Sequence, residues 1–345
     1  MREDEKYMRR CLELAKLGAG NVAPNPMVGA VIVHNGKIIG EGYHQKYGEA
    51  HAEVNAFGSV AFPDLLKEST VYVSLEPCSH YGKTPPCCNL LIEKKVKRVV
   101  VGCVDPYAEV SGNGIKAIEE AGIEVAVGVL EKECLELNRR FFTFHTKKRP
   151  YVILKWAQSP DGYMDIDRHH KEKGIHWITQ AETKILTHQW RHEEAAILVG
   201  KNTVATDNPQ LSCRAVRGNS PIRIILDPEM RLDYGAFHVG DRSVQTYILS
   251  RKKVISNGNL KFIQPKSFEV SDILFALYEL NILSVIIEGG KKTLESFIQS
   301  GIWDEARVLS GTSPLKTGLK APEIEGAERT SFLYGKDSVK IIGND

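Results

Sequence analysis

The residues best suited to chemistry lie between positions 51 and 87. His51 and Glu53 stand two positions apart, and Cys78 and Cys87 follow a run of β-type apolar residues. One imidazole and two thiolates form a soft donor set that suits zinc, and three protein ligands leave a fourth position for water. Glu53 lies beside this set, where a carboxylate serves proton transfer. We therefore predict one Zn2+ per chain, held by His51, Cys78 and Cys87, with Glu53 as the catalytic acid and base.

A structural zinc site, or a core histidine beside unrelated cysteines, is the alternative interpretation. Cys88 is the residue that would complete a closed site with four protein ligands. Adjacent residues rarely both reach one ion, and a structural site has no use for a carboxylate two positions from a ligating histidine. We therefore favour the open catalytic site and regard Cys88 as a spare thiol.

The composition is that of a globular protein with more than one core. The chain has 345 residues, of which 42% are hydrophobic and 26% charged. This length suggests about two domains. The net charge of +2 creates no strong basic field that would indicate a nucleic-acid partner.

Targeting signals and a disulfide framework are both unexpected from this sequence. No apolar run reaches the ~18 residues that a membrane span requires, and the first residues are charged, without the apolar segment of a signal peptide. The seven cysteines are odd in number and irregularly spaced. We therefore expect a reducing, cytoplasmic setting and no membrane association.

Alternating strands and helices must position the first set of residues. Asn35-Gly36 predicts a type I′ hairpin turn, and Pro77 predicts a helix start that would place Cys78 near a helix N-terminus, where the dipole favours a thiolate. The first half is therefore expected to form an α/β sandwich. We predict strands near residues 28–33, 38–40, 71–75, 99–104 and 123–129, and helices near 7–17, 51–56, from 77, 115–121 and 131–142.

The chain restarts as a second α/β domain after a polar, basic segment that ends at Pro150. We place the boundary there and predict domains at 1–147 and 148–345. Glu288-Gly289-Gly290 joins a strand to a helix, a turn that suits a phosphate, although it does not match the dinucleotide fingerprint. We predict strands near 151–157, 195–200, 222–227 and 282–287, and helices near 180–191, 271–281 and from 292.

Motifs in both halves resemble one family. His-Ala-Glu-Val at 51–54 and Glu-Pro-Cys-Ser-His-Tyr-Gly-Lys-Thr-Pro-Pro-Cys at 76–87 are similar to the deaminase half of the bifunctional riboflavin-biosynthesis deaminase/reductases. The second half is similar to the reductase half of the same family, through Ser-x-Asp-Gly at 159–162, Trp-Ile-Thr at 177–179 and Asp-Asn-Pro-x-Leu at 207–211. The resemblance covers nearly the whole chain, and the motifs occur in family order.

The resemblance implies a fold, cofactors and site residues for both halves. It implies a cytidine-deaminase-like αβα sandwich followed by a dihydrofolate-reductase-like α/β domain that uses NADPH. Carried over by position, the cofactor-binding residues are Ala157, Trp177, Thr203, Asp207 and Gly290. The substrate-binding residues are Asn25, His44 and Lys83 in the first half, and Lys155, Arg191, Leu211, Arg214 and Glu288 in the second.

The implied activity has two parts. The first is hydrolytic deamination of 2,5-diamino-6-(5-phosphoribosylamino)pyrimidin-4-one, in which Glu53 moves the protons. The second is NADPH-dependent reduction of the ribosyl chain of 5-amino-6-(5-phosphoribosylamino)uracil to ribityl, with Asp207 and Glu288 as candidate general acids. This sequence departs from the family pattern at Tyr107, Ile175 and Pro228. We also expect a homo-oligomer.

Two other functions share some of these features. A nucleic-acid adenosine or cytidine deaminase would use similar zinc chemistry, but the near-neutral charge and the nine-position separation of Cys78 and Cys87 disfavour it. A zinc-stabilised binding module would have no role for Glu53 and would close the fourth zinc position.

Overall fold

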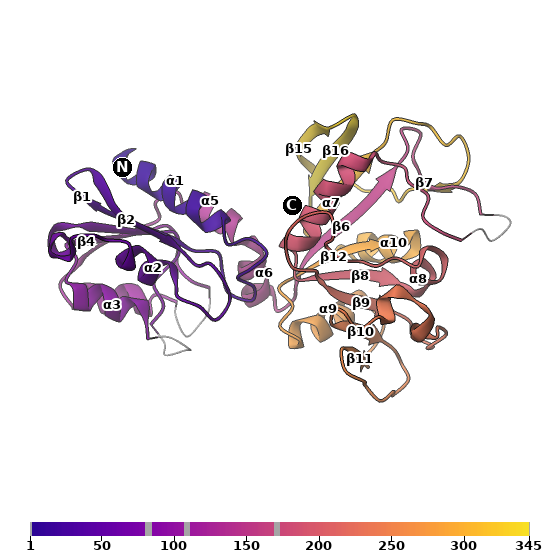
Figure 1. Ribbon diagram of the computed structural model, residues 1–345, viewed down its shortest axis with the longest axis horizontal. Helices are drawn as coiled ribbons and strands as arrows, with labels where there is room; N and C mark the ends of the chain where they lie inside the picture. Colours follow the sequence, from indigo (N-terminus) through magenta and orange to yellow (C-terminus); the bar gives the residue numbers. More distant parts are fainter. Residues whose placement is uncertain (1, 80–84, 107–110, 169–172, 345) are drawn as a thin grey trace. The chain divides into compact units, whose positions relative to one another are not determined.

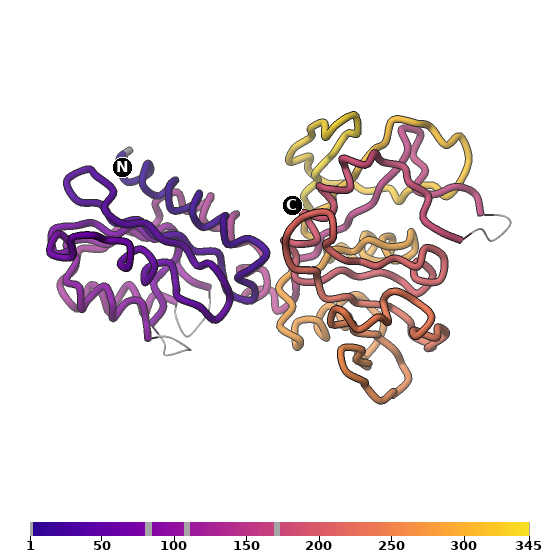
Figure 2. The backbone as a smooth tube through the Cα atoms, in the orientation of Figure 1, coloured from indigo at the N-terminus to yellow at the C-terminus, as the bar shows by residue number. Residues whose placement is uncertain are grey.

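Short runs rich in valine and isoleucine form the strands of this computed structural model. The structure describes residues 2–79, 85–106, 111–168 and 173–344. It divides into two compact units, residues 1–148 and 149–345, and each has its own sheet and its own apolar core. Figure 2 traces the backbone of both units.

The first unit is built on a sheet whose described strands number five, in the order β2-β1-β3-β4-β5. β1 runs antiparallel to β2 and β3, whereas β3, β4 and β5 are parallel. Asn35 and Gly36 join β1 to β2 with φ angles of 48° and 73°, as the predicted type I′ turn requires. The strands are β1 (Gly29–His34), β2 (Lys37–Tyr43), β3 (Thr70–Val73), β4 (Arg98–Val101) and β5 (Glu124–Val127).

Helices cover both faces of this sheet (Figure 1). Met8 of α1 packs with Val31 on one face, and Ala56 of α2 packs with Ile32 on the other, since successive strand residues point to opposite sides. The helices are α1 (Arg2–Lys16), α2 (Ala52–Gly58), α3 (Cys87–Lys94), α4 (Asn113–Glu120), α5 (Glu131–Leu137) and α6 (Arg139–Lys147), with a 3₁₀ turn η1 (Pro63–Glu68).

Two predicted helices differ from the observed ones. Pro77 does not start a helix; α3 begins at Cys87 instead, with Pro86 as its N-cap. The expected helix over 131–142 is interrupted at Asn138, between α5 and α6. The buried side chain of Asn138 donates to the carbonyl of Met27 and accepts from its amide, at 2.9 Å each, so a tertiary contact decides this break.

The second unit contains a long, mostly parallel sheet. Its described strands number nine, in the order β11-β10-β9-β8-β12-β6-β13-β16-β15, and neighbouring strands are parallel except in the pairs β13–β16 and β16–β15. A small separate sheet pairs β7 (Tyr163–Asp165) with β14 (Leu319–Lys320). The main strands are β6 (Tyr151–Gln158), β8 (Ala196–Gly200), β9 (Ile222–Leu226), β10 (Thr246–Leu249), β11 (Leu260–Ile263), β12 (Ser284–Gly289), β13 (Glu305–Ser310), β15 (Ala327–Tyr334) and β16 (Asp337–Gly343).

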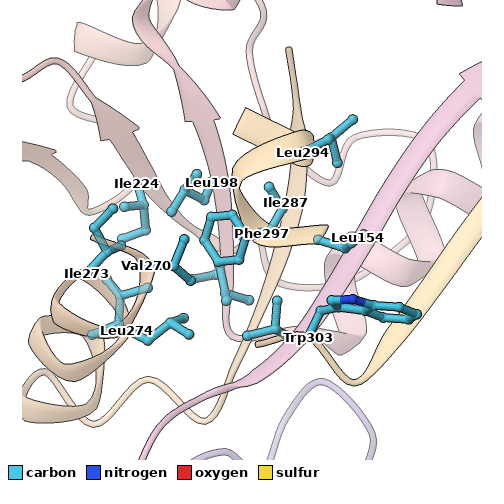
Figure 3. Packing of buried hydrophobic residues seen from close by; sticks show 14 of the residues in the cluster. Leu154, Leu198, Ile224, Val270, Ile273, Leu274, Ile287, Leu294, Phe297 and Trp303 are labelled. Carbon is cyan, nitrogen blue, oxygen red and sulfur yellow. The ribbon is translucent and has the colours of Figure 1, made fainter. Parts of the chain in front are cut away.

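The largest core lies between this sheet and the helices α9 and α10. Figure 3 shows Phe297 of α10 surrounded by aliphatic side chains, among them Leu198 and Ile287 of the sheet. On the opposite face, Trp190 of α7 and Val204 of α8 pack on the sheet. The helices are α7 (Ala181–Glu193), α8 (Lys201–Asp207), α9 (Val270–Glu279) and α10 (Lys291–Ser300), with 3₁₀ turns η2 (Tyr234–Ala236) and η3 (His238–Gly240).

The predicted strands and helices of the second half are all present, and several further elements are found. The sequence reading did not include α8, β10, β11 or β13–β16. Within the described residues, no helix combines the length and the apolar character that crossing a bilayer requires.

Candidate active sites

One imidazole and two thiols meet in the first unit, as the spacing predicted. The Nδ1 atom of His51 lies 3.6 Å from the Sγ of Cys78 and 3.3 Å from the Sγ of Cys87. All donor atoms of this group lie within 4.8 Å of one another. Zinc bonds of about 2.0–2.3 Å at tetrahedral angles place two ligand atoms roughly 3.5 Å apart. The set therefore fits a zinc ion in both its chemistry and its spacing.

Three separate segments supply these donors. His51 is the N-cap of α2, and Cys87 is the first residue of α3. Cys78 lies in the irregular segment after β3, where its sulfur accepts a hydrogen bond from the amide of Cys87 at 3.3 Å. Hydrogen bonds from the Cys87 thiol and from His51 lower the pKa of Cys78 to about 4, although burial opposes this. These hydrogen bonds favour the thiolate of Cys78. The helix expected from Pro77 is absent, and the helix amide that reaches the sulfur is that of Cys87 at the start of α3.

Glu53 is buried beside the same group. It lies in the first turn of α2, and only 3% of its surface is exposed. Burial, followed by the negative charge of Cys78, raises the pKa of Glu53 to about 7, while a hydrogen bond from its own backbone amide and the charge of His51 partly offset this rise. A carboxyl group with a pKa near neutrality can both accept and release a proton at physiological pH.

Cys88 is turned away from the donor set. Its Sγ lies 3.6 Å from the Oδ1 of Asn89, and the residue packs in the core beneath the sheet. Among the described residues, the groups able to hold a metal ion are limited to His51, Cys78 and Cys87. The closed four-ligand alternative therefore receives no support from the position of this thiol.

The structure also brings two expected substrate residues beside His51. The Nδ2 of Asn25 lies 3.1 Å from the Nε2 of His44, and the Nδ1 of His44 lies 3.0 Å from the carbonyl oxygen of Ala50. The rings of His44 and His51 meet edge to face, with centroids 5.4 Å apart. Burial lowers the pKa of His44, which favours a neutral ring that accepts from Asn25 and donates to Ala50. Lys83 lies outside the described residues.

Glu76 is a site residue that the sequence reading missed. Its buried carboxylate accepts hydrogen bonds from the amides of Asp105 and Gly112 on one oxygen, and of Gly114 and Ile115 on the other, at 3.0–3.3 Å. It thereby anchors the segment leading to Cys78 on the N-terminal turn of α4. The signal available was an acidic residue directly after a buried strand.

The second unit holds a charged cluster assembled from three distant elements. Arg191 of α7 binds Glu288 of β12 with two hydrogen bonds, of 3.0 Å from Nε and 2.7 Å from Nη2. The Nζ of Lys155, on β6, lies 3.8 Å from the same carboxylate. All three side chains are largely buried. The resemblance predicted these residues, and the structure brings them together.

Charge balance decides the ionisation of this cluster. Burial favours the neutral form of Glu288, but the charges of Arg191 and Lys155 outweigh it and lower the pKa of Glu288 to about 2. Burial also lowers the pKa of Lys155, while Glu288 opposes that change. Glu288 therefore has no proton to donate at neutral pH, which argues against the general-acid role considered for it.

A turn beside this cluster has the geometry of a nucleotide cradle. β8 and β12 are parallel neighbours that lead into α8 and α10, whose N-caps are Gly200 and Gly290. The Gly290 amide donates to the hydroxyl of Thr203 at 3.0 Å. A Cβ on Gly289 would lie 3.1 Å from that hydroxyl oxygen, so the turn approaches α8 as closely as a bare backbone allows. Such a turn, with helix amides uncapped by side chains, fits a phosphate of NADPH.

The other expected cofactor residues are more dispersed. Asp207 ends α8, where burial raises the pKa of its carboxyl to about 6 and Arg168, 3.7 Å away, opposes this rise. Ala157 lies on β6. Trp177 is half exposed, with the Nζ of Lys184 placed 3.5 Å over the centre of its ring.

Residues 211–214 run beside the charged cluster. Leu211 is buried with a φ of 51°, and the backbone amide of Arg214 donates to the Nδ1 of His188 at 3.2 Å. Arg191 reaches this segment through a hydrogen bond of 3.4 Å from its Nη1 to the carbonyl of Ser212. His188 stands three positions before Arg191 and therefore lies on the same side of α7.

Of the three departures from the family pattern, Ile175 is 44% exposed and Pro228 accepts a backbone hydrogen bond from Arg251. Tyr107 lies outside the described residues.

Each of the two units matches a known protein family. Residues 1–103 match the family described as the cytidine and deoxycytidylate deaminase zinc-binding region, and residues 150–324 match the RibD C-terminal domain. The chain is 41% identical over 350 residues to the riboflavin biosynthesis protein RibD of Aquifex aeolicus, covering 99% of this chain and 96% of that protein. It is 34% identical over 322 residues to the RibD of Escherichia coli, covering 88% of this chain and 86% of that protein.

Solved structures show the same likeness over the whole chain. A diaminohydroxyphosphoribosylaminopyrimidine deaminase/5-amino-6-(5-phosphoribosylamino)uracil reductase from Thermotoga maritima is similar, with a TM-score of 0.90, 36% identity and 99% coverage of both chains. The RibD of Acinetobacter baumannii is similar at a TM-score of 0.88, with 32% identity and 99% coverage of both.

The fold and the donor set define the class: an enzyme with a cytidine-deaminase-type zinc domain followed by a reductase domain. This class confirms the expected fold. The chain belongs to the RibD family of riboflavin biosynthesis proteins.

Proposed function

We propose that the chain catalyses two successive reactions of riboflavin biosynthesis, one in each unit. The first removes ammonia hydrolytically from 2,5-diamino-6-(5-phosphoribosylamino)pyrimidin-4-one. The second reduces the ribosyl chain of the product, 5-amino-6-(5-phosphoribosylamino)uracil, to ribityl with NADPH. Family membership supports both reactions. We assign the deaminase domain to residues 1–147 and the reductase domain to residues 148–345, in line with the two matching family descriptions.

In the deaminase, His51, Cys78 and Cys87 hold the zinc ion and Glu53 moves the protons. When bound, zinc supplies Lewis-acid chemistry that activates water near neutral pH. Glu53 would accept a proton from the attacking water and deliver it to a ring nitrogen, and would then move the proton of the added hydroxyl to the amine, so that the C–N bond breaks, the carbonyl forms and ammonia leaves. The burial of Glu53, which raises its pKa to about 7, suits this exchange.

The pyrimidine is positioned by side chains around His51. Asn25 and His44 offer hydrogen-bonding groups to the base, and the contact of His44 with Ala50 fixes its ring. Lys83 completes the set by family position. A neutral His44 ring suits this position, because a protonated ring would repel a zinc ion held by the neighbouring His51.

In the reductase, the β12–α10 turn and its neighbours hold the cofactor. Gly290 and Thr203 supply the cradle for a phosphate, and Ala157, Trp177 and Asp207 complete the set by family position. When bound, NADPH supplies a hydride to the anomeric carbon of the substrate. The departing ring oxygen then needs a proton, and Asp207, whose pKa burial raises to about 6, is a better donor than the ionised Glu288.

The ribose phosphate binds beside the charged cluster. Arg191 and Arg214 attract the phosphate, because a guanidinium binds phosphate oxygens in a bidentate manner. Glu288 accepts from sugar hydroxyls while holding Arg191 in place, and Lys155 lies beside it. Leu211 supports the segment that carries Arg214.

A homo-oligomer and a cytoplasmic location are part of the same proposal. β15 ends the large sheet, and its Leu333 is 73% exposed, which leaves an apolar edge for a second copy. The odd number and irregular spacing of the seven cysteines, none of which forms a disulfide, support a reducing compartment. Sedimentation of the purified protein tests the first point: a single monomeric species at all concentrations contradicts it.

The observation that carries the deaminase assignment is a buried carboxylate beside one imidazole and two thiols, with Cys88 directed elsewhere. Metal analysis of two matched variants tests it. Cys87→Ser should lose zinc and ammonia release, whereas Cys88→Ser should keep both. Loss of zinc from the Cys88 variant alone would contradict the ligand assignment.

A further inference from the structure

One face of α7 fastens the segment from 212 to 219, which carries Arg214. Contacts at both ends of this segment reach the helix: the amide of Arg214 donates to His188, and the amide of Asn219 donates to His192. These histidines stand four positions apart and therefore lie on one side of the helix. Arg191 lies on the same side and donates to the carbonyl of Ser212. The helix that carries one phosphate-binding arginine thus holds the backbone of the other.

His188 is placed to act through its Nδ1 lone pair. Its side chain is buried, and its Nδ1 lies 3.2 Å from the amide nitrogen of Arg214. Burial, and then the charges of Arg191 and Arg214, lower the pKa of His188 to about 4. The ring is therefore neutral at working pH and keeps an acceptor, and both guanidinium groups lie near enough to affect its charge.

The contact between His192 and the 212–219 segment also depends on a close approach of the backbone to the ring. The Nδ1 of His192 accepts from the amide of Asn219 at 3.0 Å. The preceding residue is Gly218, where an added Cβ would lie only 2.3 Å from that same nitrogen. The backbone therefore lies directly on the imidazole, and only glycine allows this approach.

We propose that His188 and His192 are positioning residues of the reductase reaction, which hold the 212–219 segment so that Arg214 stands beside Arg191 for the substrate phosphate. In this role neither histidine contacts the substrate or the cofactor. The inference rests on the proposed function, in which Arg214 binds that phosphate. The Nδ1 acceptor of each ring holds one backbone amide of the segment, that of Arg214 for His188 and that of Asn219 for His192.

The test compares variants that remove or retain that acceptor. His188→Ala removes it, whereas His188→Asn places an amide oxygen near the position of Nδ1. His192→Ala removes the second contact, and Gln189→Ala is the matched control, because Gln189 lies on the same helix but bonds to Glu193. Calorimetric binding of ribose 5-phosphate and the KM for 5-amino-6-(5-phosphoribosylamino)uracil are measured for each. Ammonia release by the same preparations reports on the integrity of the other unit.

We expect His188→Ala to weaken ribose 5-phosphate binding and raise KM roughly tenfold with little change in kcat, a loss typical of one unsatisfied amide. His192→Ala should have a smaller effect in the same direction, and His188→Asn should recover most of the loss. In an Arg214→Ala background, His188→Ala should change binding less than about twofold, because its effect passes through Arg214.

Three results would overturn the inference in distinguishable ways. If Arg214→Ala weakens binding but the His188 and His192 variants bind ribose 5-phosphate like the Gln189 control, the histidines do not position the arginine. If Arg214→Ala itself binds normally, the phosphate assignment in the proposed function fails, and the inference fails with it. Equal effects of His188→Ala with and without Arg214 would likewise show an independent role.

Discussion

Two buried glutamates, one in each unit, have pKa values displaced in opposite directions. Burial and the thiolate of Cys78 raise the pKa of Glu53 to about 7. Glu288 is also buried, but Arg191 and Lys155 outweigh burial and lower its pKa to about 2. Burial alone therefore does not set the role of a carboxylate. Burial, with the charge of Cys78, lets Glu53 hold a proton near neutral pH, whereas the adjacent cations keep Glu288 an anion.

The two sites also differ in how their residues are distributed along the chain. The expected zinc donors and Glu53 lie within residues 51–87. Their combination of residue types and spacing is characteristic of a catalytic zinc site. The cluster of Lys155, Arg191 and Glu288 joins β6, α7 and β12. The first site is a local pattern, and the second is created by the order of strands in the sheet.

The largest expected effect is on Glu53. Glu53→Gln retains the shape of the side chain but cannot exchange a proton, so ammonia release should fall about 10²–10⁴-fold. Zinc content and NADPH oxidation with 5-amino-6-(5-phosphoribosylamino)uracil should be unchanged. Metal analysis and the two assays on one preparation measure this. Deamination at the normal rate would remove the proton-exchanging role from Glu53.

Removing the other glutamate should affect folding as well as catalysis. Glu288→Ala leaves Arg191 and Lys155 buried without a counter-charge, which typically costs about 3–5 kcal/mol. Denaturant unfolding should show this loss in the reductase domain, together with loss of NADPH oxidation, while ammonia release persists. A variant with unchanged stability and unchanged reduction would show that the cations do not depend on Glu288.

The displaced pKa of Glu288 also predicts a dependence of stability on pH. Its pKa falls from an ordinary value of 4.5 to about 2 in the folded protein, so its stabilising effect is present above pH 4.5 and is lost as pH falls toward 2. The shift corresponds to about 3 kcal/mol. Urea unfolding of wild type and Glu288→Gln at pH 5 and pH 3 isolates the pH-dependent contribution of Glu288 to the free energy of unfolding. This contribution should be missing from the variant. Identical pH profiles would contradict the displaced pKa.

A smaller effect is expected at Glu76, which acts on the zinc site from a distance. Glu76→Gln keeps the size of the side chain but loses the charge that accepts the α4 amides, including those of Gly114 and Ile115. The segment before Cys78 should loosen, and zinc affinity should fall about 10–100-fold, as for other residues that support metal ligands. Competition with a chelator measures this change. Unaltered zinc affinity would limit Glu76 to supporting the fold.

The sequence predicted the first site from its own residues but placed one ligand on the wrong element. Glu76, two residues before Cys78, bonds to backbone amides near α4 that lie far away in the chain, and no local pattern shows such partners. Asn138 breaks the helix predicted over 131–142 through a similarly distant contact with Met27. The start of α3 at Cys87 rather than at Pro77 is a further case in which tertiary contacts outweigh a helix-start signal.

The second site was predictable only through family resemblance. Isolated arginines and glutamates are ordinarily exposed, and nothing near Arg191 in the sequence indicates a buried partner 97 positions away. His188 and His192 escaped notice for a similar reason, because their partners are backbone amides whose identity leaves no trace in the sequence. The parallel strands β6, β8, β9 and β12 were readable from apolar runs, whereas β10, β11 and β13 were missed and exposed β15 gave no such run.

The most direct test of two ordered sites on one chain uses the Glu53→Gln variant with NADPH and each substrate in turn. With the diaminopyrimidine phosphate, we predict neither ammonia release nor oxidation of NADPH. Addition of 5-amino-6-(5-phosphoribosylamino)uracil to the same cuvette should then restore oxidation at the wild-type rate. NADPH oxidation with the first substrate, in the absence of ammonia release, would contradict the proposed order and the division of work between the two units.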